Sequence, residues 1–229
     1  MEIEILQLIE GARRARGLAV IIDVFRAFSV ECWAFSRGAK RILPVAGIDE
    51  AFALRRANPG ALLVGERGGR KCEGFDCGNS PSQLEAFDVC GRAIVHTTSA
   101  GTQGIANAAG ADEIVGASLV NAAATAEYIR RRNPPAVSLV CMGLDGVSET
   151  DEDTLCADYI AALLRGESPD ISQRVRRLSE TSGKKFFNPD LQEVFPRRDF
   201  EMCTQVDRFP YALRVRRESQ LCVEKVEIK

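Results

Sequence analysis

The stretch Leu18–Val24, with the sequence LAVIIDV, decides the fold class of this 229-residue chain. It is a short apolar run rich in β-branched residues, without polar alternation, and this pattern predicts a strand buried on both faces. A helical spacing follows over 27–37 and ends at Gly38. Asp23 lies near the carboxyl end of the predicted strand, where open α/β sheets bind their ligands.

The same alternation of strand and helix continues along the chain. Strands are predicted over 41–45, 61–64, 92–96, 113–116 and 136–141, and helices over 49–57, 103–109, 121–132 and 151–165. We therefore predict an α/β fold with a mainly parallel sheet covered by helices in three layers. After Gly166 the chain becomes helical and charged, and two alternating runs over 211–216 and 221–228 predict a C-terminal hairpin. We expect one catalytic unit over 1–229, or two lobes, about 1–116 and 117–229, with the site between them.

The composition excludes several classes of protein. Hydrophobic residues make up 45% and charged residues 27% of the chain, which excludes a disordered protein. The net charge of −2 gives no general attraction to nucleic acid or to an anionic membrane, so a bound anion must be held by local cations. The N-terminus does not resemble a signal peptide, and the longest apolar segment, 18–22, is too short to span a bilayer. Eight cysteines without a C-x-x-C pair predict reduced, mostly buried thiols and a cytoplasmic location.

Four loops after predicted strands carry chemically unusual residues. They are DVFRA at 23–27, GERGGRK at 65–71 with its continuation GFDCGNSP at 74–81, HTTSAGT at 96–102, and GLDG at 143–146 followed by TDED at 150–153. Each has a plain structural alternative, such as a helix-capping Asp23 paired with Arg26, or a capping box of Thr150 with Asp153. Together they offer carboxylates for a divalent metal, arginines for a dianion and a turn rich in N–H groups. That combination suits phosphoryl chemistry.

The motifs of the common phosphatases are absent. A cysteine phosphatase needs Cys-x5-Arg, whereas Cys32 and Arg37, like Cys203 and Arg208, have four residues between them. His96 is the only histidine and lies near the end of an apolar strand, which argues against a histidine phosphatase. No D-x-D directly follows a predicted strand, and there is no G-x-S-x-G elbow.

The motifs VIIDVFRA, GERGGRKCEGFDCGNSP and TTSAGT, with the segment from Glu152 to Ala157, resemble the 2-phosphosulfolactate phosphatase family over roughly residues 18–165. The resemblance implies a Mg²⁺-dependent phosphomonoesterase for phosphorylated 2-hydroxy acids. The family reaction converts (2R)-2-phospho-3-sulfolactate to 3-sulfolactate and phosphate, a step of coenzyme M biosynthesis. Phe25 stands where the family motif has Leu, a change of packing rather than of chemistry.

Roles for individual residues follow from this resemblance and from their side-chain chemistry. Mg²⁺ is the expected cofactor, with hard oxygen ligands from Asp23, Glu66 and Asp153. The expected catalytic residues are Asp23, Arg26, Glu66 and Arg67, with further positive charge from Arg70 and Lys71. The expected substrate-binding residues are Lys71, Asn79, Ser80, Thr98, Ser99 and Thr102.

Two other functions stay open at this point. The chain could be a phosphatase for another small phospho-2-hydroxy acid, such as phospholactate or phosphoglycolate. It could also be a non-catalytic protein that binds a small anion in the same cradle. The expected partner is a small anionic substrate, with a homodimer as an open alternative and with no nucleic acid or membrane.

Overall fold

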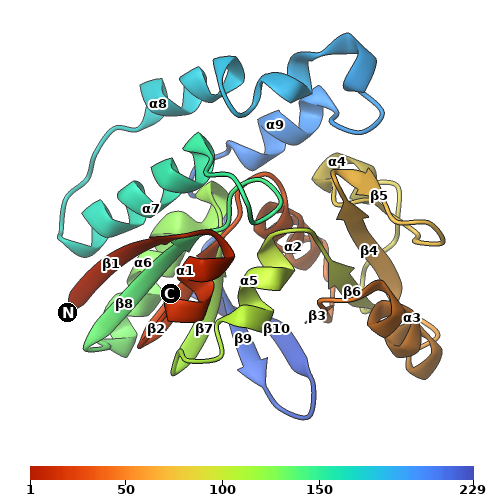
Figure 1. The fold of residues 1–229 in the computed structure, drawn as a ribbon, viewed down its shortest axis with the longest axis horizontal. Coiled ribbons are helices and arrows are strands. Elements are labelled where there is room, and N and C mark those ends of the chain that lie inside the picture. The colour runs from red at the N-terminus through yellow and green to blue at the C-terminus, as the bar shows by residue number, and fades with distance from the viewer.

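A ten-stranded sheet runs through the computed structural model, which describes residues 1–229 (Figure 1). The strands are β1 (Glu2–Gln7), β2 (Leu18–Ile22), β3 (Arg41–Pro44), β4 (Leu62–Arg67), β5 (Arg70–Lys71), β6 (Ala93–Thr97), β7 (Glu113–Ala117), β8 (Ala136–Cys141), β9 (Tyr211–Arg217) and β10 (Leu221–Glu227). Their order across the sheet is β1-β8-β2-β7-β9-β10-β3-β6-β4-β5. The predicted α/β class with a mainly parallel sheet is confirmed.

Helices connect most of the parallel strands and cover the sheet. They are α1 (Leu8–Arg14), α2 (Ala27–Ser36), α3 (Ile48–Ala57), α4 (Pro81–Leu84), α5 (Gly101–Asn107), α6 (Ala122–Arg132), α7 (Asp151–Leu164), α8 (Ser172–Arg177) and α9 (Arg197–Cys203). Short 3₁₀ turns lie at Leu119–Asn121, Leu178–Glu180, Lys184–Phe187 and Pro189–Leu191. No helix of the structure is long and apolar enough to cross a membrane.

Strand β2 is buried on both faces, as its sequence predicts. Ala19 and Ile21 belong to the core under α1, α2 and α5, whereas Val20 and Ile22 belong to the core under α6 and α7. A third, smaller core lies under α3 and includes Leu63 of β4. All eight cysteines are free thiols, and six of them are buried.

The C-terminal hairpin joins two groups of parallel strands. Strands β1, β8, β2 and β7 form one group, and β3, β6 and β4 form the other. The hairpin β9–β10 fills the space between β7 and β3. Strand β9 pairs antiparallel with β7, and β10 pairs antiparallel with β3. The predicted hairpin is therefore present, and it completes the sheet. A division of the chain near residue 116 would cut β7, which pairs with β2.

The segment 166–209, called here the C-terminal segment, contains α8 and α9. It crosses the end of the sheet at which α4 and the loop after β4 lie (Figure 1), and α9 packs against α4. Residues far apart in the chain therefore meet at the carboxyl ends of the parallel strands.

Candidate active site

Side chains from the loops at the carboxyl ends of the parallel strands line a cavity of about 300 Å³. Asp23 and Arg26 lie between β2 and α2, and Glu66 is the next-to-last residue of β4. Asn79 precedes α4, and Ser99 lies between β6 and α5. The structure thus brings together five of the residues that the sequence analysis selects.

Asp23 is a buried acid close to other acids. Its Oδ1 accepts a hydrogen bond from the backbone N–H of Ala27 at 3.2 Å. A Cβ on Gly101 would lie 2.9 Å from its Oδ2, so only glycine lets α5 approach the carboxylate this closely. Burial is the largest cause that raises the pKa of Asp23, to about 6, and repulsion from Glu66 and Glu152 adds to it against the opposing N–H groups.

Glu66 is held by the backbone around it. Its Oε1 accepts from the N–H of Ser99 at 2.7 Å, and its Oε2 accepts from the N–H of Gly69 at 2.6 Å. The Ser99 hydroxyl donates to Oε2 as well, at 3.2 Å. Two loops that the sequence analysis treats separately, the glycine-rich loop and the TTSAGT loop, are therefore joined through this carboxylate.

Arg26 lies at the junction of this cavity with a second one of about 640 Å³. Asn79 also lines both cavities, whereas Arg70 and Lys71 line only the second. Asn79 Oδ1 lies 3.3 Å from Nε2 of His96, which is fully buried. The two cavities together give room for a molecule with more than one anionic group.

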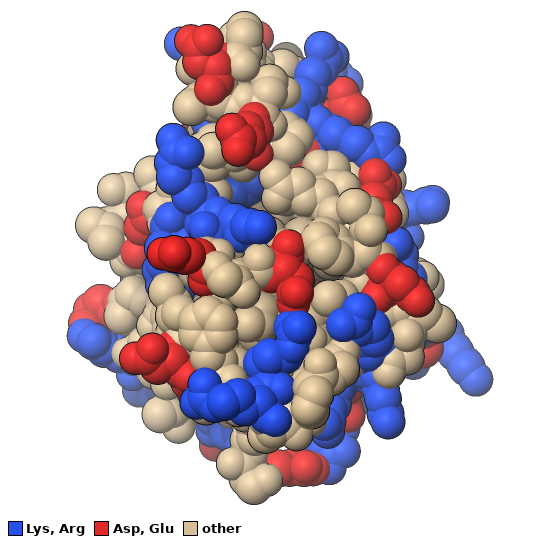
Figure 2. Space-filling view, turned by 90° about the vertical axis from the view of Figure 1, so that its right-hand side faces the viewer, with Lys and Arg blue, Asp and Glu red and all other residues tan.

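The outer surface does not concentrate charge of one sign on the face drawn in Figure 2. Lys and Arg side chains lie among Asp and Glu side chains there, without a continuous basic area. A small anion bound on this side depends on the cations of the cavities themselves.

Asp153 does not line the first cavity, and its expected role as a Mg²⁺ ligand stays a prediction. Its Oδ1 accepts from the N–H of Val24 and its Oδ2 from the N–H of Gly143, both at 2.8 Å, so it joins the loops after β2 and β8. The alternative of a capping box with Thr150 is wrong, because Thr150 makes no side-chain cap and the Asp153 carboxylate is used elsewhere. Burial, followed by repulsion from nearby acids, raises the pKa of Asp153.

Three predicted hydroxyl groups bond within the protein. Thr98 and Thr102 are buried, and each side-chain oxygen accepts from the backbone N–H of the other residue. Ser80 caps α4 by accepting from the N–H of Gln83, and it donates to Asp199 at 2.8 Å. None of the three lines either cavity. Their expected contact with substrate stays a prediction.

Arg67 lines neither cavity. Its guanidinium donates to the carbonyl oxygens of Glu66 and Ala46, at 2.6 and 2.9 Å, and to the hydroxyl of Thr97 at 2.9 Å. These contacts tie the end of β4 to the ends of β3 and β6. A substrate contact by Arg67 likewise stays a prediction.

The C-terminal segment contributes residues to the site that were not predicted from the sequence. Lys185 and Phe195 line the first cavity, and the Lys185 ammonium lies 5.2 Å from the centre of the Phe195 ring. A Cβ on Gly69, where φ is +79°, would lie 2.4 Å from Phe195, so glycine is required for this close packing. Asp199 pairs with Arg26 at 2.9 Å. Only the aromatic residues within a charged stretch could have indicated that this segment packs on the site.

The acids of the first cavity are compatible with Mg²⁺. No three His, Cys, Asp or Glu side chains converge as a ready metal cage anywhere in the chain. Mg²⁺ is usually held by one or two carboxylates, with waters and substrate phosphates completing its octahedron. Asp23 and Glu66 offer that number of donors beside one cavity. The repulsion between these two acids is relieved by a cation.

Paired acids that share a cavity with a buried arginine, at the carboxyl ends of strands from both parallel groups, define an α/β enzyme with a site for a small anion. A family model described as 2-phosphosulpholactate phosphatase matches residues 3–217. The chain belongs to this family. The resemblance seen in the sequence is thereby confirmed, and with it the assignment as an enzyme of the phosphatase type.

Curated relatives can be aligned with this chain over most of their lengths. A probable 2-phosphosulfolactate phosphatase of Caldicellulosiruptor saccharolyticus is 41% identical over 180 residues, which cover 77% of this chain and 74% of that protein. A protein of the same description from Bacillus subtilis is 29% identical over 213 residues, 91% of this chain and 92% of that protein. Another, from Carboxydothermus hydrogenoformans, is 40% identical over 165 residues, 72% of this chain and 68% of that protein.

Proposed function

We propose that the protein is a Mg²⁺-dependent phosphomonoesterase that hydrolyses (2R)-2-phospho-3-sulfolactate to 3-sulfolactate and phosphate. Membership of the family supports the substrate, since the relatives are described as phosphatases of 2-phosphosulfolactate. The observation that carries the proposal is the cavity that Asp23, Glu66, Arg26 and Lys185 line together. Such a site combines ligands for a metal with cations for a phosphoryl group.

In direct hydrolysis, a water oxygen would bond to phosphorus as the bond between phosphorus and the C2 oxygen breaks, and a proton from the water would pass to the C2 oxygen. When bound, Mg²⁺ would neutralise charge on the phosphoryl oxygens. Asp23 and Glu66 would hold the metal, and Asp23 would also orient the attacking water. Arg26 and Lys185 would bind oxygens of the substrate. Arg70 and Lys71, in the adjoining cavity, are available for its carboxylate or sulfonate.

A substrate panel tests the proposal. Phosphate release is measured from 2-phosphosulfolactate, phospholactate and phosphoglycolate, each with Mg²⁺ and with EDTA. We expect the highest kcat/KM for 2-phosphosulfolactate, and loss of turnover with EDTA that is restored by added Mg²⁺. A higher kcat/KM for another substrate would reassign the specificity. Binding without release of phosphate would indicate an anion-binding protein.

Three further expectations belong to this proposal. We propose that the reaction serves coenzyme M biosynthesis, because sulfolactate is the product. A cytoplasmic location and a homodimer also stay predictions. Size-exclusion chromatography with light scattering tests the homodimer directly.

A further inference from the structure

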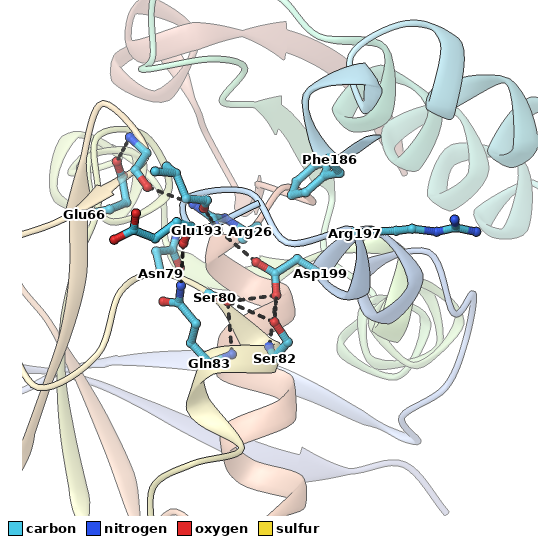
Figure 3. Close-up of polar contacts among 12 residues, drawn as sticks. Arg26, Glu66, Asn79, Ser80, Ser82, Gln83, Phe186, Glu193, Arg197 and Asp199 are labelled. Carbon is cyan, nitrogen blue, oxygen red and sulfur yellow. Dashed lines mark hydrogen bonds and ion pairs between the residues drawn. The ribbon is translucent and has the colours of Figure 1, made fainter. Parts of the chain in front are cut away.

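Asp199 of α9 is fully buried, and its carboxylate accepts four hydrogen bonds (Figure 3). Its Oδ2 accepts from Nη1 of Arg26 at 2.9 Å. Its Oδ1 accepts from the hydroxyls of Ser80 and Ser82, at 2.8 and 2.6 Å, and from the backbone N–H of Ser82 at 3.0 Å. The C-terminal segment thus contacts both the start of α4 and the arginine of the site through one side chain.

The contacts of Arg26 leave part of its guanidinium free. Of its five N–H groups, one donates to Asp199, one to the carbonyl of Val194 at 2.8 Å and one to the carbonyl of Gly69 at 3.1 Å. The Phe195 ring lies 4.9 Å from the guanidinium carbon. The Nε–H and one N–H of Nη2 have no partner in the protein, while Arg26 lines both cavities. Because the guanidinium is planar, its three bonded N–H groups set the direction of the two free N–H groups.

We propose that Asp199 is a positioning residue that orients Arg26 for binding an oxyanion of the substrate. The pairing carboxylate offsets much of the Arg26 charge, so this arginine acts through directed hydrogen bonds more than through its net charge. A planar guanidinium binds an oxyanion well only within its own plane, which makes its orientation decisive. The identity of the substrate rests on the proposed function, whereas the anion contact rests on the geometry alone.

The alternative role for Asp199 is that it only fastens the C-terminal segment to α4. The two oxygens separate these roles, because Oδ1 bonds to the start of α4 and Oδ2 bonds to Arg26. Ser82→Ala removes a bond to Oδ1 and leaves Arg26 untouched. It is therefore a matched control for changes at Asp199.

Steady-state kinetics and thermal melts with inorganic phosphate test the positioning role. Asp199→Asn replaces one carboxylate oxygen by an NH₂ group, which cannot accept a hydrogen bond from Arg26 or from α4, whichever it faces. We expect kcat/KM to fall about 100-fold, chiefly through a higher KM. The rise in melting temperature that phosphate gives the wild type should also be lost. Asp199→Glu keeps the charge but moves it by one methylene. It should fold and should show the same loss of phosphate binding.

In contrast, Ser82→Ala should keep KM within about threefold of the wild type and should keep the phosphate-induced shift, even if it melts at a lower temperature. In an Arg26→Lys background, Asp199→Asn should change KM by less than about threefold, because the group that it orients is gone.

The positioning role is overturned if Asp199→Glu binds phosphate as the wild type does, or if Ser82→Ala raises KM as much as Asp199→Asn does. Where Asp199→Asn does not fold, Asp199→Glu decides. A wild type that binds phosphate but does not hydrolyse 2-phosphosulfolactate contradicts the proposed function, and the phosphate melts still decide the role of Asp199. A wild type that binds no phosphate overturns both.

Discussion

Asp23 and Asp153 are both buried acids, yet only Asp23 lines the first cavity. Asp23 accepts one backbone N–H at 3.2 Å and lines the cavity, whereas both oxygens of Asp153 are bonded to backbone N–H groups of two loops. The sequence indicates an acid at the end of β2 correctly, because its position after a buried strand is a local feature. It does not indicate the partners of Asp153, since Val24 lies 129 residues away in the chain.

Asp23→Asn should abolish most activity while keeping the fold. The loss of a charged Mg²⁺ ligand should lower turnover at least about 100-fold. The folded chain raises the pKa of this acid to about 6, chiefly through burial, so above that pH the charged carboxylate is disfavoured by the fold. A neutral residue of the same shape should therefore melt at the same or a higher temperature in metal-free buffer at pH 8. Mg²⁺ should stabilise the wild type and not the variant. Wild-type turnover of the variant at saturating Mg²⁺ would exclude an essential role for Asp23.

Arg67→Lys tests a residue whose motif and contacts suggest different roles. The motif predicts an oxyanion contact, and hence a change of at least about tenfold in KM or kcat. The three hydrogen bonds of Arg67 predict in addition a lower melting temperature, because a lysine cannot reach all three acceptors. Kinetics and a thermal melt of the same preparation separate the two effects. A lower melting temperature with unchanged kinetics would mean that Arg67 only holds the strand ends together.

At the scale of elements, the internal strands could be predicted well and the first one could not. Strand β2 is recognised by its continuous apolar run, and the helix after it by its spacing. Strand β1 passes directly into α1 at Leu8, whose φ is +64°. No glycine, proline or polar turn residue marks this break, so the N-terminal stretch gives no local signal of two elements.

Asp76→Asn should loosen the loop that carries Asn79. The Asp76 Oδ2 accepts from Arg55 at 2.5 Å and from the N–H of Leu63 in β4 at 2.8 Å. Partial burial raises its pKa, but these two hydrogen bonds, together with the positive charges of Arg55 and Arg92, outweigh burial and lower the pKa overall. We expect the variant to lose about 1 kcal/mol of unfolding free energy at pH 7, a modest figure because both side chains are partly exposed.

The pH dependence of that loss has a defined sign. A lowered pKa in the folded state stabilises the protein above the unfolded pKa, near 3.9, and this stabilisation disappears as the pH falls through the folded value. Urea unfolding at several pH values should therefore show the difference between wild type and Asp76→Asn shrinking below about pH 4. Glu73→Gln, an exposed acid of the same loop, is the control and should show no such difference. A difference that is constant with pH would contradict the assignment.

For the whole molecule, Asp23 and Glu66, two of the three acids that line the cavity, belong to different groups of strands. Asp23 follows β2 of one parallel group, and Glu66 ends β4 of the other. Only the hairpin β9–β10 lies between the groups in the sheet, and its pairing to β3 consists of Val223 opposite Ile42. The sequence predicts a hairpin from local alternation, but its insertion into the sheet depends on contacts with β3 and β7, which are distant in the chain. No local sequence pattern predicts that the hairpin lies between the two groups of strands.

Val223→Thr tests whether this junction supports the site. Val223 is fully buried between Ile42 and Val215, and threonine keeps its shape and strand preference while burying a hydroxyl. We expect the free energy of unfolding to fall by about 1 to 3 kcal/mol in urea. Because Asp23 follows a strand of one group and Glu66 lies in a strand of the other, a disturbed junction should also raise the concentration of Mg²⁺ needed for half-maximal activity. Lys225→Thr, at an exposed position of the same strand, should change stability by less than about 0.5 kcal/mol. A destabilised Val223→Thr variant with an unchanged Mg²⁺ requirement would show that the hairpin stabilises the sheet without setting the geometry of the acids.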